Sequence, residues 1–318
     1  MIITLTANPS LDRTVELAGP LARGGVQRAT SVSAQPAGKG VNVARALAAG
    51  GEQILAVLPG DPSDPVVTGL AADGLAYLAL PIGQALRSNI TLAEPDGTTT
   101  KVNEPGPALS AAQQEELADA VLEAAAGAAW VVLAGSLPPD VVEDFYARLT
   151  ARIRRELGAA APLVALDSSG APLASAFAGG REQIPDLIKP NAEELAELSG
   201  VATAGELESD PALAASAARA LVDAGAGAVL ATLGSRGAVL TTGAGSWFAS
   251  HPPVAARSTV GAGDSALAGY LLAHRAGSDP AGCLRQAVAH GSAAVALPGT
   301  AIPSPDQTTP AAVNVVGI

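Results

Sequence analysis

Short apolar runs alternate with amphipathic segments along most of the chain. The apolar runs have the length of buried strands, and the segments between them have the length and periodicity of helices. The expected strands are Ile2–Thr6, Gln53–Leu58, Ala76–Leu80, Trp130–Ala134, Leu163–Asp167, Asp186–Lys189, Ala228–Leu233 and Ala238–Thr241. The expected helices are Gly40–Ala49, Pro65–Ala72, Ser110–Ala126, Pro139–Leu157, Asn191–Ser199, Pro211–Ala224, Gly263–Arg275 and Pro280–Leu297. This alternation predicts a mostly parallel sheet covered on both faces, in one α/β domain over residues 1–318.

Two stretches depart from this alternation and predict partly exposed strands. Thr14–Ala34 carries short segments in which apolar and polar residues alternate, and Ser88–Asn103 predicts a hairpin around Pro95-Asp96-Gly97. Alternation of this kind is typical of strands with one face in solvent. We expect a small antiparallel sheet added to the main body as a lid. The Pro/Thr-rich tail after Pro298 is expected to be irregular.

Composition excludes several classes of protein. Of the 318 residues, 48% are hydrophobic and 15% are charged, which excludes a disordered chain. A net charge of -12 argues against a general nucleic-acid binder, and 3% aromatic residues argue against a base-stacking surface. The one cysteine, Cys283, excludes an intrachain disulfide and multi-cysteine zinc sites. With no apolar span and no basic segment in Met1–Pro9, we expect a soluble cytoplasmic protein without membrane partners.

Lysine is rare in this chain and therefore informative. The 18 basic residues include only three lysines, namely Lys39, Lys101 and Lys189. A lysine ammonium is a compact charge on a flexible stem that can reach a phosphate. Each lysine is therefore a candidate ligand, and the alternative is that a bias toward arginine left a few lysines by chance.

The segment Thr259-Val-Gly261-Ala-Gly263-Asp264 enters an expected helix. Glycines before a helix let backbone N–H groups converge on an anion, and the helix dipole adds to the attraction. Asp264 in the first turn is placed to take a proton from a substrate hydroxyl; the alternative is a simple N-terminal helix charge. The spacing also matches a dinucleotide fingerprint, but it lies late in the chain and its following acid, Asp279, lies between two helices.

A second cluster follows the first strand, at the sheet edge where α/β proteins bind ligands. Asp12 is suited to accept hydrogen bonds from vicinal sugar hydroxyls, and Gly38 and Gly40 flank Lys39 just before Asn42. Because Gly40 follows Lys39 in place of Ser or Thr, this is not a Walker A motif. The alternative for this cluster is a glycine turn beside an Asx turn.

Two further clusters carry candidate phosphate ligands. Arg87 and Lys101 lie on the two arms of the expected hairpin and are candidates to face one anion; the alternative is an exposed hairpin with edge-protecting charges. Lys189 precedes Asn191 and Glu194, which form a capping box. A functional interpretation directs Lys189 toward nucleotide phosphates and Glu194 toward hydrated Mg²⁺. Weaker signals follow other strands, at Ser136, Asp167, Thr232, Gly234 and Gly237.

Together these motifs resemble the PfkB (ribokinase-like) family of carbohydrate kinases, from Thr6 to about Thr300. Thr259–Asp264 downstream of Gly38-Lys39-Gly40 is the most specific part, and Asn191-x-x-Glu194 is a further family mark. Similarity to the sugar-phosphate branch is carried by Asn8–Asp12, Arg87–Asn89 and Asn103–Gly106. The sequence departs from the family pattern at Ala37, Ser88 and Ser168. The resemblance implies a three-layer α/β/α ribokinase-like fold, with a β-sheet lid built from about 13–35 and 87–104.

The resemblance also implies roles for individual residues, with ATP and Mg²⁺ as cofactors. Asp264 is then the catalytic base. The acceptor is expected to be held by Asp12, Gly38, Lys39, Asn42, Arg87, Lys101, Asn103 and Ser136. The nucleotide is expected on Lys189, Asn191, Glu194, Thr232, Gly234, Gly237, Thr259, Gly261, Ala262, Gly263 and Gly291. Of these, Gly261, Ala262 and Gly263 form the anion hole, and Glu194 holds the metal through water.

The expected reaction is ATP-dependent phosphorylation of a ketohexose phosphate, foremost fructose 1-phosphate to fructose 1,6-bisphosphate. Alternatives within the enzyme class are a tagatose-6-phosphate or a fructose-6-phosphate kinase. Outside it stand a sugar-phosphate-binding sensor that has lost its chemistry and, more remotely, a nicotinamide-dependent oxidoreductase. Exposed lid strands also make a homodimer through the lid an expectation.

Overall fold

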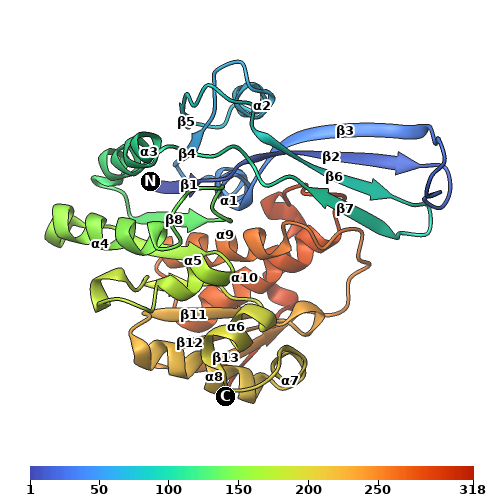
Figure 1. Ribbon diagram of the computed structural model, residues 1–318. Helices are drawn as coiled ribbons and strands as arrows, with labels where there is room; N and C mark the ends of the chain where they lie inside the picture. The colour runs from blue at the N-terminus through green and yellow to red at the C-terminus, as the bar shows by residue number, and fades with distance from the viewer.

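A ten-stranded sheet forms the centre of the molecule in the computed structural model, which describes residues 1–318 (Figure 1). In spatial order it runs β14 (Asn314–Gly317), β13 (Gly245–Ser250), β12 (Ala238–Thr242), β11 (Ala228–Thr232), β10 (Leu187–Ile188), β9 (Leu163–Asp167), β8 (Trp130–Ala134), β1 (Ile2–Thr6), β4 (Ile54–Pro59) and β5 (Tyr77–Leu80). Every neighbouring pair from β11 to β5 is parallel, whereas β11 to β14 pair antiparallel. The expected mostly parallel sheet is therefore confirmed.

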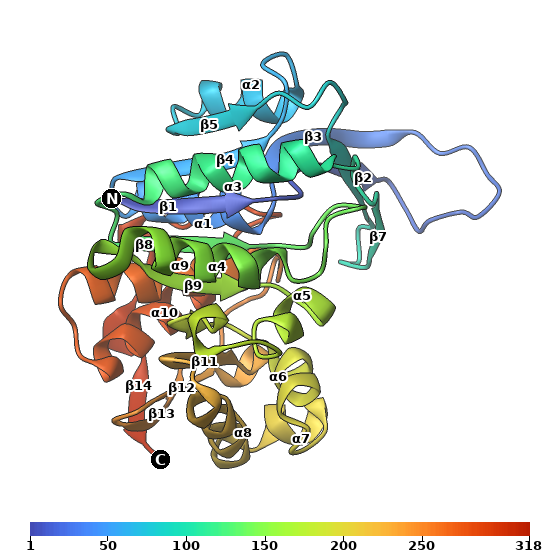
Figure 2. The ribbon, with the colours of Figure 1, turned by 60° about the vertical axis from the view of Figure 1, so that its left-hand side comes forward.

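Helices cover both faces of this sheet and give the three expected layers (Figure 2). One face packs against α1 (Lys39–Ala49), α2 (Pro65–Ala72), α9 (Ala262–Arg275) and α10 (Pro280–Val295). The other packs against α3 (Ala111–Ala125), α4 (Phe145–Leu157), α5 (Gly170–Ser175), α6 (Ala192–Ser199), α7 (Ala204–Ser209) and α8 (Pro211–Ala224). Alternate strand residues enter opposite cores: Val131 joins one, and Trp130 and Val132 join the other.

A second, four-stranded sheet projects from the main body on the right of Figure 1. Its order is β3 (Ala29–Ala37), β2 (Ser10–Leu17), β6 (Arg87–Ala93) and β7 (Thr99–Asn103). The expected hairpin β6–β7 is confirmed, but the expectation of a wholly antiparallel sheet is wrong, because β2 and β6 pair parallel. Each of these two strands follows a strand of the body, so both leave the body in the same direction.

The two faces of this lid have different surroundings. Asp12, Asn89 and Asn103 share one face, and so does Gln35, which donates a hydrogen bond to Thr300 of the body. We call this the inner face. The opposite, outer face carries Leu11, Val15, Val32, Ile90, Leu92 and Val102. Near the body α2 packs against this outer face, with Gly69 against the ring of Pro36.

Three local expectations need correction. The helix expected from Pro139 begins at Phe145, because Asp140 adopts a left-handed conformation with φ 65° that a continuous helix excludes. The tail after Pro298 is not wholly irregular, since β14 extends the main sheet. The structure adds β13, α5 and α7, which are short or weakly patterned. No helix combines the length and the apolarity needed to cross a lipid bilayer.

Candidate active site

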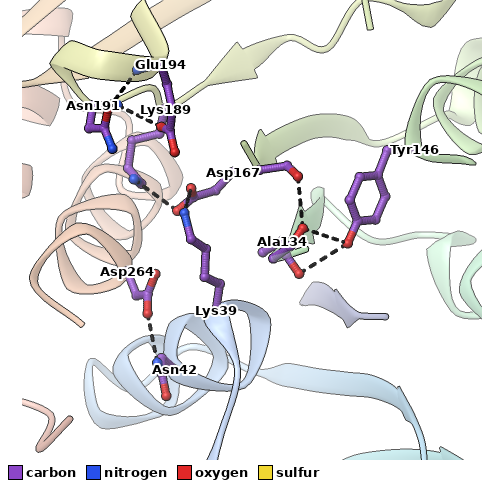
Figure 3. Close-up of polar contacts among 11 residues, drawn as sticks. Lys39, Asn42, Ala134, Tyr146, Asp167, Lys189, Asn191, Glu194 and Asp264 are labelled. Atoms are coloured by element: carbon purple, nitrogen blue, oxygen red, sulfur yellow. Dashed lines mark hydrogen bonds and ion pairs between the residues drawn. The ribbon is translucent and has the colours of Figure 1, made fainter. Parts of the chain in front are cut away.

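The candidate catalytic groups meet at one edge of the main sheet. Asp167 ends β9, Lys189 directly follows β10, and Lys39 and Asp264 lie at the starts of α1 and α9 (Figure 3). Carboxyl ends of parallel strands share one edge, so residues far apart in the sequence converge there. The lid strands leave the body at the same edge, where β2 follows β1 and α1 follows β3.

The start of α9 has the features of an anion site. Gly261 precedes the helix with φ 77°, a conformation that favours glycine, and no side chain caps the first N–H groups. A Cβ at Gly263 would lie 3.1 Å from Lys189 Nζ, so the buried ammonium lies directly beside the helix terminus. Free N–H groups, the helix dipole and a lysine together can bind a phosphoryl group.

Asp264 lies one residue beyond this anion site and is buried. Its Oδ2 accepts a hydrogen bond of 2.8 Å from Asn42 Nδ2. Burial, and then the nearby charge of Asp167, raise the pKa of Asp264 to about 6, against the opposing effects of Lys39, Asn42 and Lys189. The carboxylate is therefore ionised at neutral pH and more basic than an ordinary aspartate, so it can accept a proton.

A fully buried carboxylate, Asp167, lies between the two lysines. Lys39 Nζ is 2.6 Å from its Oδ1, and Lys189 Nζ is 3.0 Å from its Oδ2. Burial alone would raise the pKa of Asp167, but the two lysines bring it below its usual value. Sequence reasoning gave Asp167 only a weak signal, its place at the end of an expected strand.

On the inner face of the lid, hydrogen bonds orient Asp12. Its Oδ1 accepts bonds from Ser10 Oγ at 2.8 Å and from Asn89 Nδ2 at 2.9 Å. Asn103 lies directly opposite Asn89 in the strand register. The second oxygen of Asp12 stays available to a ligand hydroxyl. Asn89 was not among the predicted site residues, although the motif Arg87–Asn89 contained it.

Arg87 has backbone partners where the lid joins the body. Its Nη1 donates to Glu104 O at 3.1 Å, and its Nη2 donates to Asn8 O at 3.0 Å. The structure does not bring Arg87 and Lys101 together. Lys101 lies on the same face but opposite Thr91, four residues farther along β6, or about 13 Å at the usual strand rise.

Asn8 links this junction to the strand ends of the body. Its Nδ2 donates to Pro105 O at 3.0 Å and to Ser136 Oγ at 3.3 Å. A Cβ on Gly106 would meet the Asn8 amide oxygen, which explains a glycine there. Ser136 follows β8 and is exposed, so it borders the same edge as Lys39 and Asp264.

Several residues predicted to bind the nucleotide lie at the start of α6 and around the turn after β11. Thr232 pairs with Asn191 through a β-bridge, and the capping box is confirmed: Glu194 Oε2 accepts from Asn191 N at 2.9 Å. A Cβ on Gly237 would collide with the carbonyl oxygen of Ala249, so packing alone requires glycine at this position.

Three other positions were predicted to bind the nucleotide. Two of them lie near the start of α9, and the third lies in the turn after β11. A Cβ on Gly291 would lie 3.3 Å from Ala262 O, so Gly291 lets α10 approach the anion site closely. Thr259 is exposed two residues before Gly261. Gly234 begins the turn after β11, with its missing Cβ facing Glu208.

The donor set tests whether Mg²⁺ fits. No group of three or more His, Cys, Asp or Glu side chains could enclose a metal ion. Mg²⁺ in phosphoryl-transfer sites commonly takes one or two carboxylates, with waters and substrate phosphates filling its octahedron. The buried Glu194 uses only Oε2 in its cap, and its Oε1 remains available. Mg²⁺ carried by a nucleotide therefore fits this site, with Glu194 as its protein partner.

A family model described as the pfkB family of carbohydrate kinases matches residues 5–307, nearly the whole chain. The chain belongs to the pfkB family of carbohydrate kinases. It is an enzyme of the kinase class, and the family resemblance seen in its motifs is confirmed.

Similar proteins divide between two activities. 1-Phosphofructokinase of Rhodobacter capsulatus is 36% identical over 310 residues, which cover 96% of this pfkB-family kinase and 94% of that protein. ATP-dependent 6-phosphofructokinase isozyme 2 of Mycobacterium tuberculosis is also 36% identical, and the match covers 94% of this chain and 85% of that protein. Among solved structures, phosphofructokinase-2 from Escherichia coli with substrates and products superposes with a TM-score of 0.85, at 31% identity over 96% of both chains. The same protein is known in a tetrameric inhibited form.

Proposed function

We propose that this kinase transfers the γ-phosphoryl group of ATP to the free primary hydroxyl of a ketohexose phosphate, with fructose 1-phosphate as the acceptor. The hydroxyl oxygen forms a bond to the γ-phosphorus, and the bond from that phosphorus to the β–γ bridging oxygen breaks. The products are fructose 1,6-bisphosphate and ADP. One observation carries the proposal: Asp264, an unusually basic buried carboxylate, lies next to a helix terminus and a lysine suited to a phosphate.

Asp264 takes the hydroxyl proton as general base. Its ionised form dominates at neutral pH, and Asn42 holds its Oδ2 in one orientation. A positioned base of this kind contributes on the order of 10²–10⁴-fold to a rate. Asp264 then releases the proton to solvent after the bisphosphate leaves.

The donor phosphates are held where charge develops in the reaction. The N–H groups at Gly261, Ala262 and Gly263 and the ammonium of Lys189 offset the negative charge of the transferred group. Mg²⁺ bound to ATP would supply further charge neutralisation, and Glu194 would hold it through water. Asn191, Thr232, Gly234, Gly237, Thr259 and Gly291 border the proposed nucleotide site.

The acceptor is held between the lid and the body. Asp12 accepts hydrogen bonds from adjacent sugar hydroxyls, with its carboxylate oriented by Ser10 and Asn89. Lys39, Asn42 and the backbone at Gly38 approach from the body, and Arg87, Lys101, Asn103 and Ser136 complete the proposed acceptor site. Lys39, Arg87 and Lys101 offset the repulsion between a chain of net charge -12 and two anionic substrates.

The position of the acceptor's existing phosphate separates the candidate substrates. Fructose 1-phosphate, fructose 6-phosphate and tagatose 6-phosphate are ketohexose phosphates that each offer a primary hydroxyl. The 1-phosphofructokinase relative supports fructose 1-phosphate, and an equally identical relative named for 6-phosphofructokinase activity makes fructose 6-phosphate the second candidate.

A coupled ADP-release assay with Mg-ATP tests this choice. The acceptors are fructose 1-phosphate, fructose 6-phosphate, tagatose 6-phosphate and ribose. We expect the highest kcat/KM with fructose 1-phosphate. A higher value with another ketohexose phosphate would replace the substrate and keep the chemistry. Binding of sugar phosphates without ADP release would instead indicate a sensor.

We also propose that two copies pair through the outer face of the lid. Beyond the part covered by α2, this face carries Val15, Val32, Ile90, Leu92 and Val102, and Val32 and Val102 are 56% and 54% exposed. The same face also carries the exposed Arg13, beside Ile90. Apolar residues gathered on one sheet face in water favour association with a second such face. The oligomeric Escherichia coli relative supports assembly in this family.

A further inference from the structure

Two lysines from different halves of the site share one carboxylate. Lys39 comes from the start of α1, on the acceptor side, and Lys189 comes from the end of β10, beside the anion site. Each contacts one oxygen of Asp167, at 2.6 and 3.0 Å, and these are the only ion pairs that either lysine forms (Figure 3).

Asp264 is the nearby carboxylate that the lysines leave unpaired. Its one side-chain hydrogen bond comes from the neutral amide of Asn42. Lys39 and Lys189 both act on Asp264 at longer range, and so does the negative charge of Asp167. Two cations and two anions thus share the buried centre, and Glu194 adds a further anion that acts on Lys39.

The position of the lysines decides how basic Asp264 can be. The Lys39 side chain is 36% exposed and can move, whereas that of Lys189 is 5% exposed. After Asp167, Asp264 is the buried carboxylate whose charge acts most strongly on Lys39, ahead of Glu194. An ion pair there would occupy the carboxylate and weaken it as a base, because a contacting cation stabilises the ionised form.

We propose that Asp167 is a positioning residue for phosphoryl transfer: it holds Lys39 and Lys189 on its own carboxylate and so keeps Asp264 free to take the acceptor's proton. The inference rests on the proposed function, in which Asp264 is the base. It gives a role to a fully buried charge, which is costly to retain in a protein interior unless its partners and its use compensate.

The central test is the isosteric variant Asp167→Asn. We expect the acidic limb of the kcat/KM profile to move down by about one pH unit or more, because Asp264 loses the repulsion of the Asp167 charge and Lys39 then pairs with Asp264. At neutral pH kcat falls by about tenfold or more. Asp186→Asn is the matched control: it removes the carboxylate of another ion pair, 3.0 Å from Arg154, outside the site. It should leave the acidic limb unchanged.

A second variant separates positioning from a merely structural role. Lys39→Met alone removes a cation and should move the acidic limb upward, opposite to Asp167→Asn. In the double variant Asp167→Asn/Lys39→Met, no mobile lysine remains to pair with Asp264, so the limb should return toward its wild-type position. The proposal would be overturned if the acidic limb lay at the same pH in wild type, Asp167→Asn and Lys39→Met. It would also be overturned if the limb of the double variant lay at a lower pH than that of Asp167→Asn.

A ligand-free readout keeps this inference separate from the proposed function. Titration of ¹³C-labelled aspartate carboxyls by NMR, with Asp264→Asn identifying the signal, follows Asp264 directly. In Lys39→Met the carboxyl titration of Asp264 should move to higher pH, as the acidic limb does. This measurement remains possible even where Asp167→Asn does not fold. A wild-type enzyme inactive on every acceptor would refute the proposed function, while the carboxyl titration would still decide the placement of the lysines.

Discussion

At the scale of single residues, the site works by opposing influences on one carboxylate. Burial and the charge of Asp167 make Asp264 more basic, whereas the neighbouring lysines and the Asn42 amide oppose this. The result is a group that is ionised at neutral pH but still readily protonated. The same balance costs stability, because the folded protein holds a carboxylate in a less favourable environment than water.

Replacing the base removes the chemistry and keeps the fold. In Asp264→Asn the Asn42 amide still has an oxygen to donate to, so the site retains its shape. We expect kcat to fall by about 10³-fold, within the range for a lost general base. Steady-state kinetics with Mg-ATP and the best acceptor measure this. Asp279→Asn, which changes the cap of α10, is the control and should keep near-normal turnover.

The pH profile follows from the ionisation of the same group. With a pKa of about 6, Asp264 is ionised above that pH and protonated below it. We therefore expect kcat/KM to be level near pH 8 and to fall about tenfold per pH unit below pH 6. A profile that stays level down to pH 4.5 would contradict this assignment.

The stability of the enzyme should show the cost of that ionisation. The folded pKa of Asp264 lies at about 6, above the ordinary value of 3.8, so the ionised side chain destabilises the fold above pH 6 and not below pH 3.8. Asp264→Asn should raise the free energy of unfolding by about 2 to 3 kcal/mol at pH 7.5. The gain should shrink steadily between pH 6 and pH 4. Urea unfolding of wild type and Asp264→Asn at pH 7.5 and at pH 4 measures the difference in the free energy of unfolding.

At the scale of elements, each functional side chain depends on where a strand or helix ends. The start of α9 supplies the anion site because Gly261 turns the chain there and no side chain caps its N–H groups. On the lid, the two-residue period of β2 and β6 places Asp12 and Asn89 on the inner face. The element therefore sets which side chains face the substrate, and local hydrogen bonds then orient them.

Removing the amide that orients Asp12 tests the acceptor site of the lid. Asn89→Ala deletes donors to Asp12 and Ser10 while leaving the strand pairing intact. We expect the KM for the sugar phosphate to rise by about tenfold, as for lost hydrogen bonds to a charged group, with the KM for ATP within about twofold. Ser31→Ala on the exposed part of the lid is the control. A larger rise in the KM for ATP would place the residue elsewhere.

At the scale of the whole molecule, the lid joins two functions on its two faces. The inner face carries the proposed acceptor ligands, and the outer face carries the apolar residues Val15, Val32, Ile90, Leu92 and Val102. α2 covers only the part of the outer face near the body. An interface on the outer face would therefore constrain the same strands that hold the acceptor.

Charging the outer face should separate the copies. Val102→Glu places a carboxylate on the outer face of the edge strand β7, within the proposed interface, where burying it without a partner is unfavourable. We expect wild type to sediment as a dimer or larger species and Val102→Glu to sediment as a monomer. Val142→Glu, at a valine of the body that is 45% exposed against 54% for Val102, is the control and should not change the sedimentation. A monomeric wild type would exclude the interface.

Much of this architecture depends on interactions between residues close together in the chain. The sequence by itself determined these interactions. The strands of the parallel core are short apolar runs, and the capping box at Asn191 and Glu194 lies within four residues, so pattern and spacing suffice to predict them. The glycines and Asp264 at the start of α9 are likewise one contiguous segment. The family resemblance rested on such segments and their order along the chain.

Contacts across long stretches of chain were decided only by the tertiary structure. Lys39 and Asp167 are 128 residues apart, and Asn42 and Asp264 are 222 apart, so no local pattern pairs them. The parallel pairing of β2 with β6 and the addition of β14 to the main sheet also depend on where distant strands meet. Convergence at one sheet edge turns four separate segments into a single electrostatic unit, because the interaction between charges depends on their separation in space and not along the chain.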